Sequence, residues 1–155
     1  ARDRPAERSL VSPRDIVKGA LDLLPNLGLP VEVVAPDDLP EVSVDPGQIR
    51  QLVTNLVSNA AEATRGHGSK VVIELGSTEE GFRFRVDDEG PGFSDEVREH
   101  LFEPLFTTRA KGIGLGLALC KRIVERHGGS ICAENRPSGG ARFEVLLPQQ
   151  RRADT

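Results

Sequence analysis

The chain has 155 residues, a formal net charge of -4, 37% hydrophobic residues and 28% charged residues. This composition suits one globular domain with its own core and excludes a disordered chain. The acidic balance, and an aromatic content of 4% that is entirely Phe, argue against a nucleic-acid footprint or a base-stacking surface. No apolar run reaches the length of a transmembrane helix, and no apolar signal core follows the Arg-rich start, so we expect a cytoplasmic domain.

Hydrophobic periodicity and capping residues predict the elements in chain order. Helices are expected at residues 12–24, 45–64, 95–101 and 115–127. Strands are expected at residues 31–34, 42–44, 71–75, 82–86, 130–135 and 141–147. This mixed order predicts an α+β fold, a two-layer sandwich with helices on one face of a largely antiparallel sheet. We expect residues 1–8 to be a linker remnant, 9–148 to be the domain and 149–155 to be a polar tail.

The cysteines and histidines are expected to be structural rather than chemical residues. Cys120 and Cys132 lack C-x-x-C spacing, and both fall in apolar settings, so we expect two small buried hydrophobic side chains. His67, His100 and His127 are expected at the surface or as capping residues, and His127 suits the end of a helix.

Two asparagines lie one turn apart in the helix predicted at 45–64. Asn55 and Asn59 share one face, beside the apolar stripe. Asn is a poor helix former, so a purely solvated flank is the weaker explanation for the pair. Amide oxygens suit a hard cation such as Mg²⁺, which shares its oxygen ligands with phosphates.

Two glycine-containing segments follow. Asp88 comes just after a predicted strand and before Gly90 and Gly92, where a carboxylate can accept a hydrogen bond from an exocyclic amine. Glycines at 112, 114 and 116 open a helix, whose unpaired amides and positive dipole end favour a phosphate. Either segment alone could be an ordinary turn.

Four motifs in this order are more specific than any one of them. They are Asn55-Leu-Val-Ser-Asn59-Ala60, Asp88-Glu-Gly90-Pro-Gly92, Phe102-Glu-Pro104-Leu-Phe106 and Gly112-Ile-Gly114-Leu-Gly116-Leu117. They resemble the N box, first glycine box, F box and second glycine box of the ATP-binding catalytic domain of sensor histidine kinases. The wider superfamily also holds gyrase, Hsp90 and MutL ATPases. The resemblance covers about residues 9–148 and implies the Bergerat (GHKL) fold.

The resemblance implies a role for each matching position. Asp88 would bind the adenine amino group, with Gly90 and Gly92 beside it, while Asn59 would coordinate Mg²⁺ and Asn55 would support the phosphate end. The remaining ATP contacts would come from Arg109, Lys111, Gly112, Gly114, Gly116 and Leu117. Arg109 and Lys111 could equally be ordinary solvated charges, whereas Phe102 and Phe106 would anchor the lid.

The resemblance also implies a reaction and its partners. The domain would bind Mg²⁺-ATP and transfer the γ-phosphoryl group to a histidine on a separate helical dimerisation domain, with a response regulator as an indirect partner. None of the three histidines has the context of an acceptor, so the chain would lack its own. We expect no nucleic-acid or direct membrane contact, and a monomeric isolated domain.

Two alternatives stay open. Hydrolysing relatives carry a catalytic Glu one turn before the metal-binding Asn, and Asn55 at that place disfavours an ATPase. Many family members carry Lys where this chain has Glu62, which favours a degenerate nucleotide-binding or docking module without phosphotransfer.

Overall fold

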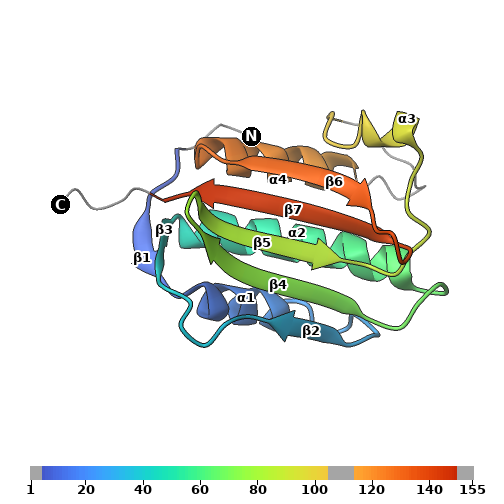
Figure 1. Ribbon diagram of the computed structural model, residues 1–155, viewed down its shortest axis with the longest axis horizontal. Helices are drawn as coiled ribbons and strands as arrows, with labels where there is room; N and C mark the ends of the chain where they lie inside the picture. The colour runs from blue at the N-terminus through green and yellow to red at the C-terminus, as the bar shows by residue number, and fades with distance from the viewer. Residues whose placement is uncertain (1–4, 105–113, 150–155) are drawn as a thin grey trace.

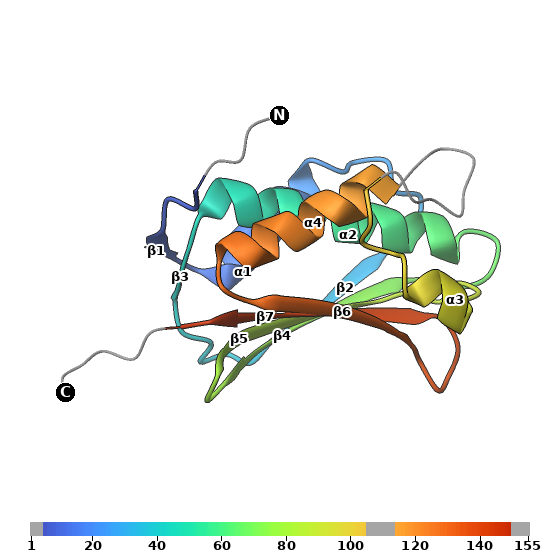
Figure 2. The same cartoon turned by 90° about the horizontal axis from the view of Figure 1, so that it is seen from above.

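The computed structural model describes residues 5–104 and 114–149, which form a two-layer α/β sandwich (Figures 1 and 2). The strands are β1 Ser9–Val11, β2 Val31–Val34, β3 Val42–Val44, β4 Val71–Thr78, β5 Gly81–Asp87, β6 Ser130–Asn135 and β7 Ala141–Pro148. The helices are α1 Pro13–Asp22, α2 Pro46–Thr64, α3 Asp95–Arg98 and α4 Gly114–Arg126. The predicted fold class is therefore confirmed.

Five strands form the main sheet, in the order β2-β4-β5-β7-β6. β2 runs parallel to β4, and the other neighbours in this sheet are antiparallel. β1 and β3 form a separate antiparallel pair at one end of the sandwich (Figure 1). The predicted, mostly antiparallel sheet is thus present, with one parallel strand at its edge.

The two faces of the sheet have different chemistry. Helices α1, α2 and α4 lie over one face of the sheet (Figure 2). Along β5, Phe82, Phe84 and Val86 are buried, whereas Arg83, Arg85 and Asp87 are only half buried. Those outward positions carry ion pairs between neighbouring strands, as when Arg85 Nε lies 2.9 Å from Glu144 Oε1. The helices therefore cover one face, and the other is a solvated, charged surface.

The central helix α2 begins and packs as its sequence predicts. Asp45 is the N-cap, with Oδ1 accepting a hydrogen bond from the Gln48 amide at 3.0 Å, and Pro46 opens the helix. Leu52 and Leu56 are at most 1% exposed. Helix α2 thus spans the layer from the β1–β3 pair to the opposite end of the sheet (Figure 2).

Some element boundaries differ from the sequence-based expectations. β1 was not expected, because three residues carry little periodicity and their strand conformation depends on pairing with β3, for example Ser9 with Val44. α3 ends at Arg98 instead of Leu101. α4 begins at Gly114, one residue earlier than predicted.

One side-chain prediction, the burial of Cys132, was wrong, and His127 matches only one of its two expected settings. Cys132 is exposed, because it occupies an outward position on β6, while Cys120 is buried in α4 as expected. His127 lies at the end of α4, as expected for a capping residue, but it is only 1% exposed and is therefore not a surface residue. Its Nε2 accepts a hydrogen bond from the Asp45 amide at 3.0 Å, and its Nδ1 lies 2.9 Å from the Ile123 carbonyl oxygen, so the ring joins the end of α4 to the start of α2.

Candidate functional site

The Asp88 carboxylate is buried and held in one orientation directly after β5. Its side chain is 3% exposed, and its Oδ1 accepts hydrogen bonds from the Gly90 and Ala141 amides, both at 2.9 Å. Its own amide donates to the Ala141 carbonyl oxygen at 2.9 Å. Because main-chain groups from two segments hold it, this carboxylate is preorganised.

The segment after Asp88 rests on the C-terminal end of α2. The Glu89 amide donates to Thr64 Oγ1 at 3.0 Å. A Cβ added at Gly90 would lie 2.6 Å from the Ala63 carbonyl oxygen, so only glycine allows this approach. Ala63 is one turn beyond Asn59, and the structure therefore brings the Asp88 loop and the asparagine helix together at the end of α2.

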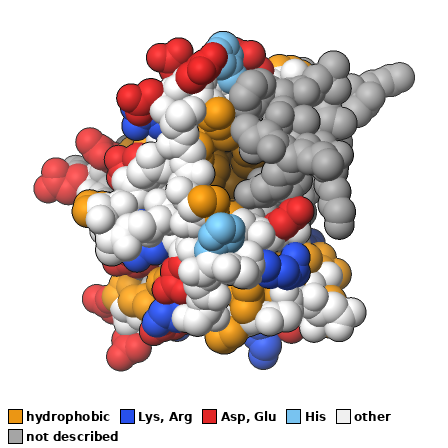
Figure 3. Space-filling view, turned by 90° about the vertical axis from the view of Figure 1, so that its right-hand side faces the viewer, with side chains coloured by type: hydrophobic (Ala, Val, Ile, Leu, Met, Phe, Trp, Pro, Cys, Tyr) orange, Lys and Arg blue, Asp and Glu red, His pale blue; other side chains and the backbone are white. Residues whose placement is uncertain are grey.

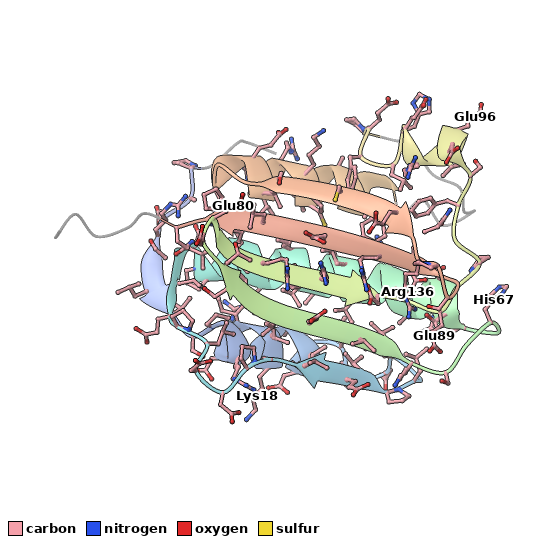
Figure 4. All side chains as sticks on the ribbon, viewed as in Figure 1. Lys18, His67, Glu80, Glu89, Glu96 and Arg136 are labelled. Carbon is pink, nitrogen blue, oxygen red and sulfur yellow. The ribbon has the colours of Figure 1, made fainter. Side chains whose placement is uncertain are left out.

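Glu89 fixes a third segment below the loop. Its Oε1 accepts hydrogen bonds from the Ser69 amide at 2.6 Å and the Lys70 amide at 3.2 Å. These backbone hydrogen bonds lower the pKa of Glu89 from its ordinary value. The loop from α2 to β4 is therefore tied to the Asp88 segment, and Figure 4 shows Glu89 at this end of the sheet.

The two asparagines of α2 have different surroundings. Asn59 is half buried, and its Nδ2 is buried with no hydrogen-bond partner among the described residues. Asn55 faces α4, because a Cβ added at Gly116 would lie 3.9 Å from its Nδ2. The Asn55 side chain also hydrogen-bonds Cys120, whose burial raises the thiol pKa to about 12.

The second glycine motif is only partly visible. Gly114 is the first residue of α4, Gly116 lies in its first turn next to Asn55, and Leu117 is 7% exposed in the hydrophobic core. The first amides of such a helix lack intrahelical partners and favour an anion in general, so the phosphate site at this helix start stays a prediction. The predicted contacts Arg109, Lys111 and Gly112, together with Phe106 of the F box, lie outside the described residues.

Aromatic side chains connect the Asp88 loop to the segment after α3. Phe93 and Phe102 each contact Phe143 edge to face, with ring centroids 6.4 and 6.1 Å apart. Gly92 adopts a φ of +77°, and an added Cβ would lie 2.6 Å from Asn135 Oδ1. At this end the molecule is hollowed, and hydrophobic side chains line the bottom (Figure 3).

The donor set fits a cation that is shared with a ligand. The described residues contain no cluster of three or more His, Cys, Asp or Glu able to hold a metal alone. Asn59 instead offers one amide oxygen, next to an amide nitrogen that no described residue satisfies. Mg²⁺ usually keeps waters and substrate phosphates beside one or two protein ligands, so this position fits Mg²⁺ bound together with a nucleotide.

Comparison with known proteins settles the family. A sequence model described as "Histidine kinase-, DNA gyrase B-, and HSP90-like ATPase" matches residues 44–151. The chain belongs to this ATPase family. The match contains all four motifs identified above, and members of the family bind ATP.

Two similar relatives are a sensor protein and a sensor histidine kinase. The chain is 38% identical over 126 residues to the sensor protein KdpD of Clostridium acetobutylicum, covering 77% of this chain and 14% of KdpD. It is 42% identical over 116 residues to the sensor histidine kinase ZraS of Escherichia coli O157:H7, covering 74% of this chain and 25% of ZraS. The chain thus spans a quarter or less of these two relatives.

Solved structures agree with the fold. The catalytic domain of histidine kinase ThkA, in a nucleotide-free form, superposes with a TM-score of 0.81 at 31% identity, covering 92% of this chain and 96% of that one. ThkA in complex with the response regulator protein TrrA gives a TM-score of 0.81 at 28% identity, covering 96% and 44%. Full-length ShkA in complex with AMPPNP shares the fold with a TM-score of 0.82 at 24% identity, covering 99% and 34%.

Sequence reasoning missed the residues that hold the site from the C-terminal side. Asn135 Oδ1 accepts from the Phe93 amide at 3.0 Å, and its Nδ2 donates to the Phe93 carbonyl oxygen at 2.8 Å. Arg136 Nη1 donates to the Asp88 carbonyl oxygen at 2.7 Å. These contacts reach main-chain atoms far away in the chain, and a local motif cannot reveal them.

Proposed function

We propose that this chain is the ATP-binding catalytic domain of a sensor histidine kinase, which transfers the γ-phosphoryl group of ATP to a histidine on a separate helical dimerisation domain. The observation that carries the proposal is the buried Asp88 carboxylate, held by two backbone amides beside the helix that bears Asn59. The domain would act as a module within a two-component system, on the cytoplasmic side. Among the described residues, no helix is both long and apolar enough to cross a membrane.

Each residue has a part in this reaction. Asp88 accepts a hydrogen bond from the adenine exocyclic amine, Asn59 holds Mg²⁺, and Asn55 supports the phosphate end beside the first turn of α4. Mg²⁺, when bound, neutralises phosphate charge. An acceptor imidazole nitrogen forms the new bond to the γ-phosphorus while the bond to the β–γ bridging oxygen breaks and ADP leaves. Positioning is the main task of the protein, so Asn55 need not act as a base.

Calorimetry with Mg²⁺-ADP tests the base contact. Asp88→Asn keeps one side-chain oxygen, which can still accept the hydrogen bonds of the Gly90 and Ala141 amides. The new side-chain amide nitrogen, a donor, would then face the donating exocyclic amine, and the negative charge that favours the amine is lost. We expect affinity to fall by about tenfold or more with little change in stability. Glu144→Gln is the matched control, since that carboxylate pairs with Arg85 on the other face of the sheet. Unchanged affinity in Asp88→Asn would refute this site.

A second comparison tests the metal position and the reaction. Asn59→Ala should weaken binding of Mg²⁺-ADP, whereas Ser58→Ala, an exposed change on the same helix, should not. Labelled ATP, with the helical acceptor domain supplied in trans, should place label on the acceptor histidine. Nucleotide binding without transfer would favour the docking module that Glu62 suggests, and rapid ATP turnover by the domain alone would favour a hydrolysing relative.

A further inference from the structure

The turn between β6 and β7 lies against the main chain of Asp88. Arg136 Nη1 donates to the Asp88 carbonyl oxygen at 2.7 Å, while the Arg136 amide donates to the Gly140 carbonyl oxygen at 2.8 Å. Gly140 has a φ of +86°, and a Cβ there would overlap the Asp88 carbonyl oxygen. Figure 4 shows Arg136 on this turn, at the same end of the sheet as Glu89.

The main bond of Arg136 is to the carbonyl, rather than to the neighbouring Asp87 carboxylate. Asp87 already accepts two hydrogen bonds from Arg142, at 2.8 and 3.0 Å. Arg136 Nε lies 3.9 Å from Asp87 Oδ2, beyond hydrogen-bond distance. The Arg136 side chain is 23% exposed, so its planar guanidinium is partly desolvated and makes a directional bond to Asp88.

The same turn also aims the carboxylate. Ala141, the residue after Gly140, donates its amide to Asp88 Oδ1, and Arg136 holds the turn to the Asp88 carbonyl. Hydrogen bonds from this turn therefore hold both the side chain and the main chain of Asp88 in place. A shift of the turn would move the acceptor oxygens even though the Asp88 side chain remained intact.

We propose that Arg136 is a positioning residue that sets the discrimination between adenine and bases without an exocyclic amine. The inference rests on the proposed function, in which Asp88 contacts the adenine amine. Arg136 contributes through the direction of that contact and makes no contact with phosphates. It therefore acts on the base preference of the site and leaves the rest of the nucleotide affinity unchanged.

Calorimetry with Mg²⁺-ADP and Mg²⁺-IDP measures this preference, because inosine has a carbonyl oxygen in place of the amine. We expect Arg136→Ala to lower ADP affinity roughly tenfold and to leave IDP affinity within about twofold. The ratio of ADP affinity to IDP affinity should therefore fall steeply. Arg136→Lys, which keeps one charged donor, should retain an intermediate ratio. Arg85→Ala is the matched control: it removes an arginine from the outer face of the sheet, where its side chain pairs with Glu144, and it should keep the wild-type ratio.

The outcomes separate this inference from the proposed function. Equal losses for both nucleotides in Arg136→Ala would mean general destabilisation and would overturn the positioning role, as would an unchanged ratio. If the alanine variant fails to fold, the ratio measured for Arg136→Lys decides in the same way. If the wild-type chain binds neither nucleotide, the proposed function itself fails.

Discussion

Single glycines decide how closely the segments around Asp88 approach one another. Gly139 and Gly140 both have positive φ angles, +106° and +86°. They differ in what surrounds them: nothing lies within 4 Å of a Cβ added at Gly139, whereas one at Gly140 would overlap the Asp88 carbonyl oxygen. Substitutions at Gly139 and Gly140 can therefore distinguish the cost of backbone strain from the cost of steric overlap.

Alanine substitutions at these two glycines should have unequal effects. Gly139→Ala adds only the strain of a left-handed alanine, about 1 kcal/mol of unfolding free energy. Gly140→Ala must also displace Asp88, so we expect about 2–3 kcal/mol and a weaker affinity for Mg²⁺-ADP. Urea denaturation and calorimetry measure the two effects. Equal losses of stability, with unchanged affinity in both variants, would contradict the steric argument.

The residues of the site divide into those that a sequence can reveal and those that it cannot. Asp88 and Asn59 stand in motifs with fixed spacing, so their types and positions predict them. Arg136 and Asn135 are invisible to such reasoning, because they bind backbone atoms and almost any local sequence offers those atoms. The burial of His127 at the start of α2 was not predicted for the same reason: its partner there is the amide of Asp45, which no pattern identifies.

At the scale of elements, capping and periodicity predicted the helices and the main strands well. The prediction failed where an element depends on a distant partner. β1 is short and exists through β3, and the parallel pairing of β2 with β4 follows from the chain path, not from side-chain alternation. Capping patterns also cannot show that the end of α4 and the start of α2 meet through one imidazole ring.

That junction predicts a pH dependence of stability. Burial, the largest cause, lowers the pKa of His127, and nearby Arg8 and Arg126 lower it further, while the Ile123 carbonyl and Asp45 raise it. The folded state thus binds a proton less readily than the unfolded state. The contribution of His127 is fully present above about pH 6.5, the unfolded value, and declines as pH falls through the lower folded value.

Denaturation at a series of pH values tests the junction. The wild-type chain should lose stability below about pH 6.5, and His127→Gln should lose less across the same range because it cannot titrate. His67→Gln is the control, since His67 is exposed on the loop after α2 and has no part in the junction. Identical profiles for the wild type and His127→Gln would contradict the assignment.

At the scale of the whole molecule, α2 runs between two ends of the sandwich that have different surroundings. Asp88 and its supporting segments lie at the C-terminal end of α2. At its N-terminal end, the segment before β1 is tied down: Glu7 donates its amide to Asp45 Oδ2 at 2.8 Å, and Arg8 donates to the Ser43 and His127 carbonyl oxygens at 2.8 and 3.0 Å. One end carries the candidate ligand site, and the other holds the residues that precede β1.

Substitutions at the two ends should therefore have opposite signatures. Arg8→Ala removes two charged hydrogen bonds near the surface, and we expect a loss of about 1 kcal/mol of stability with unchanged Mg²⁺-ADP affinity. Asp88→Asn should do the reverse. Thermal unfolding and calorimetry on both variants measure this. A binding defect in Arg8→Ala as large as that of Asp88→Asn would show that the ends are energetically coupled.

The unlike surroundings of the two cysteines have a practical consequence. Cys120 sits inside the helical layer with a pKa near 12, which leaves it almost no thiolate for an alkylating reagent. Cys132 opens onto solvent from the sheet, although partial burial and the neighbouring glutamates raise its pKa as well. A maleimide dye applied at mildly alkaline pH would therefore label Cys132 selectively, and the protein could be followed by fluorescence without any substitution.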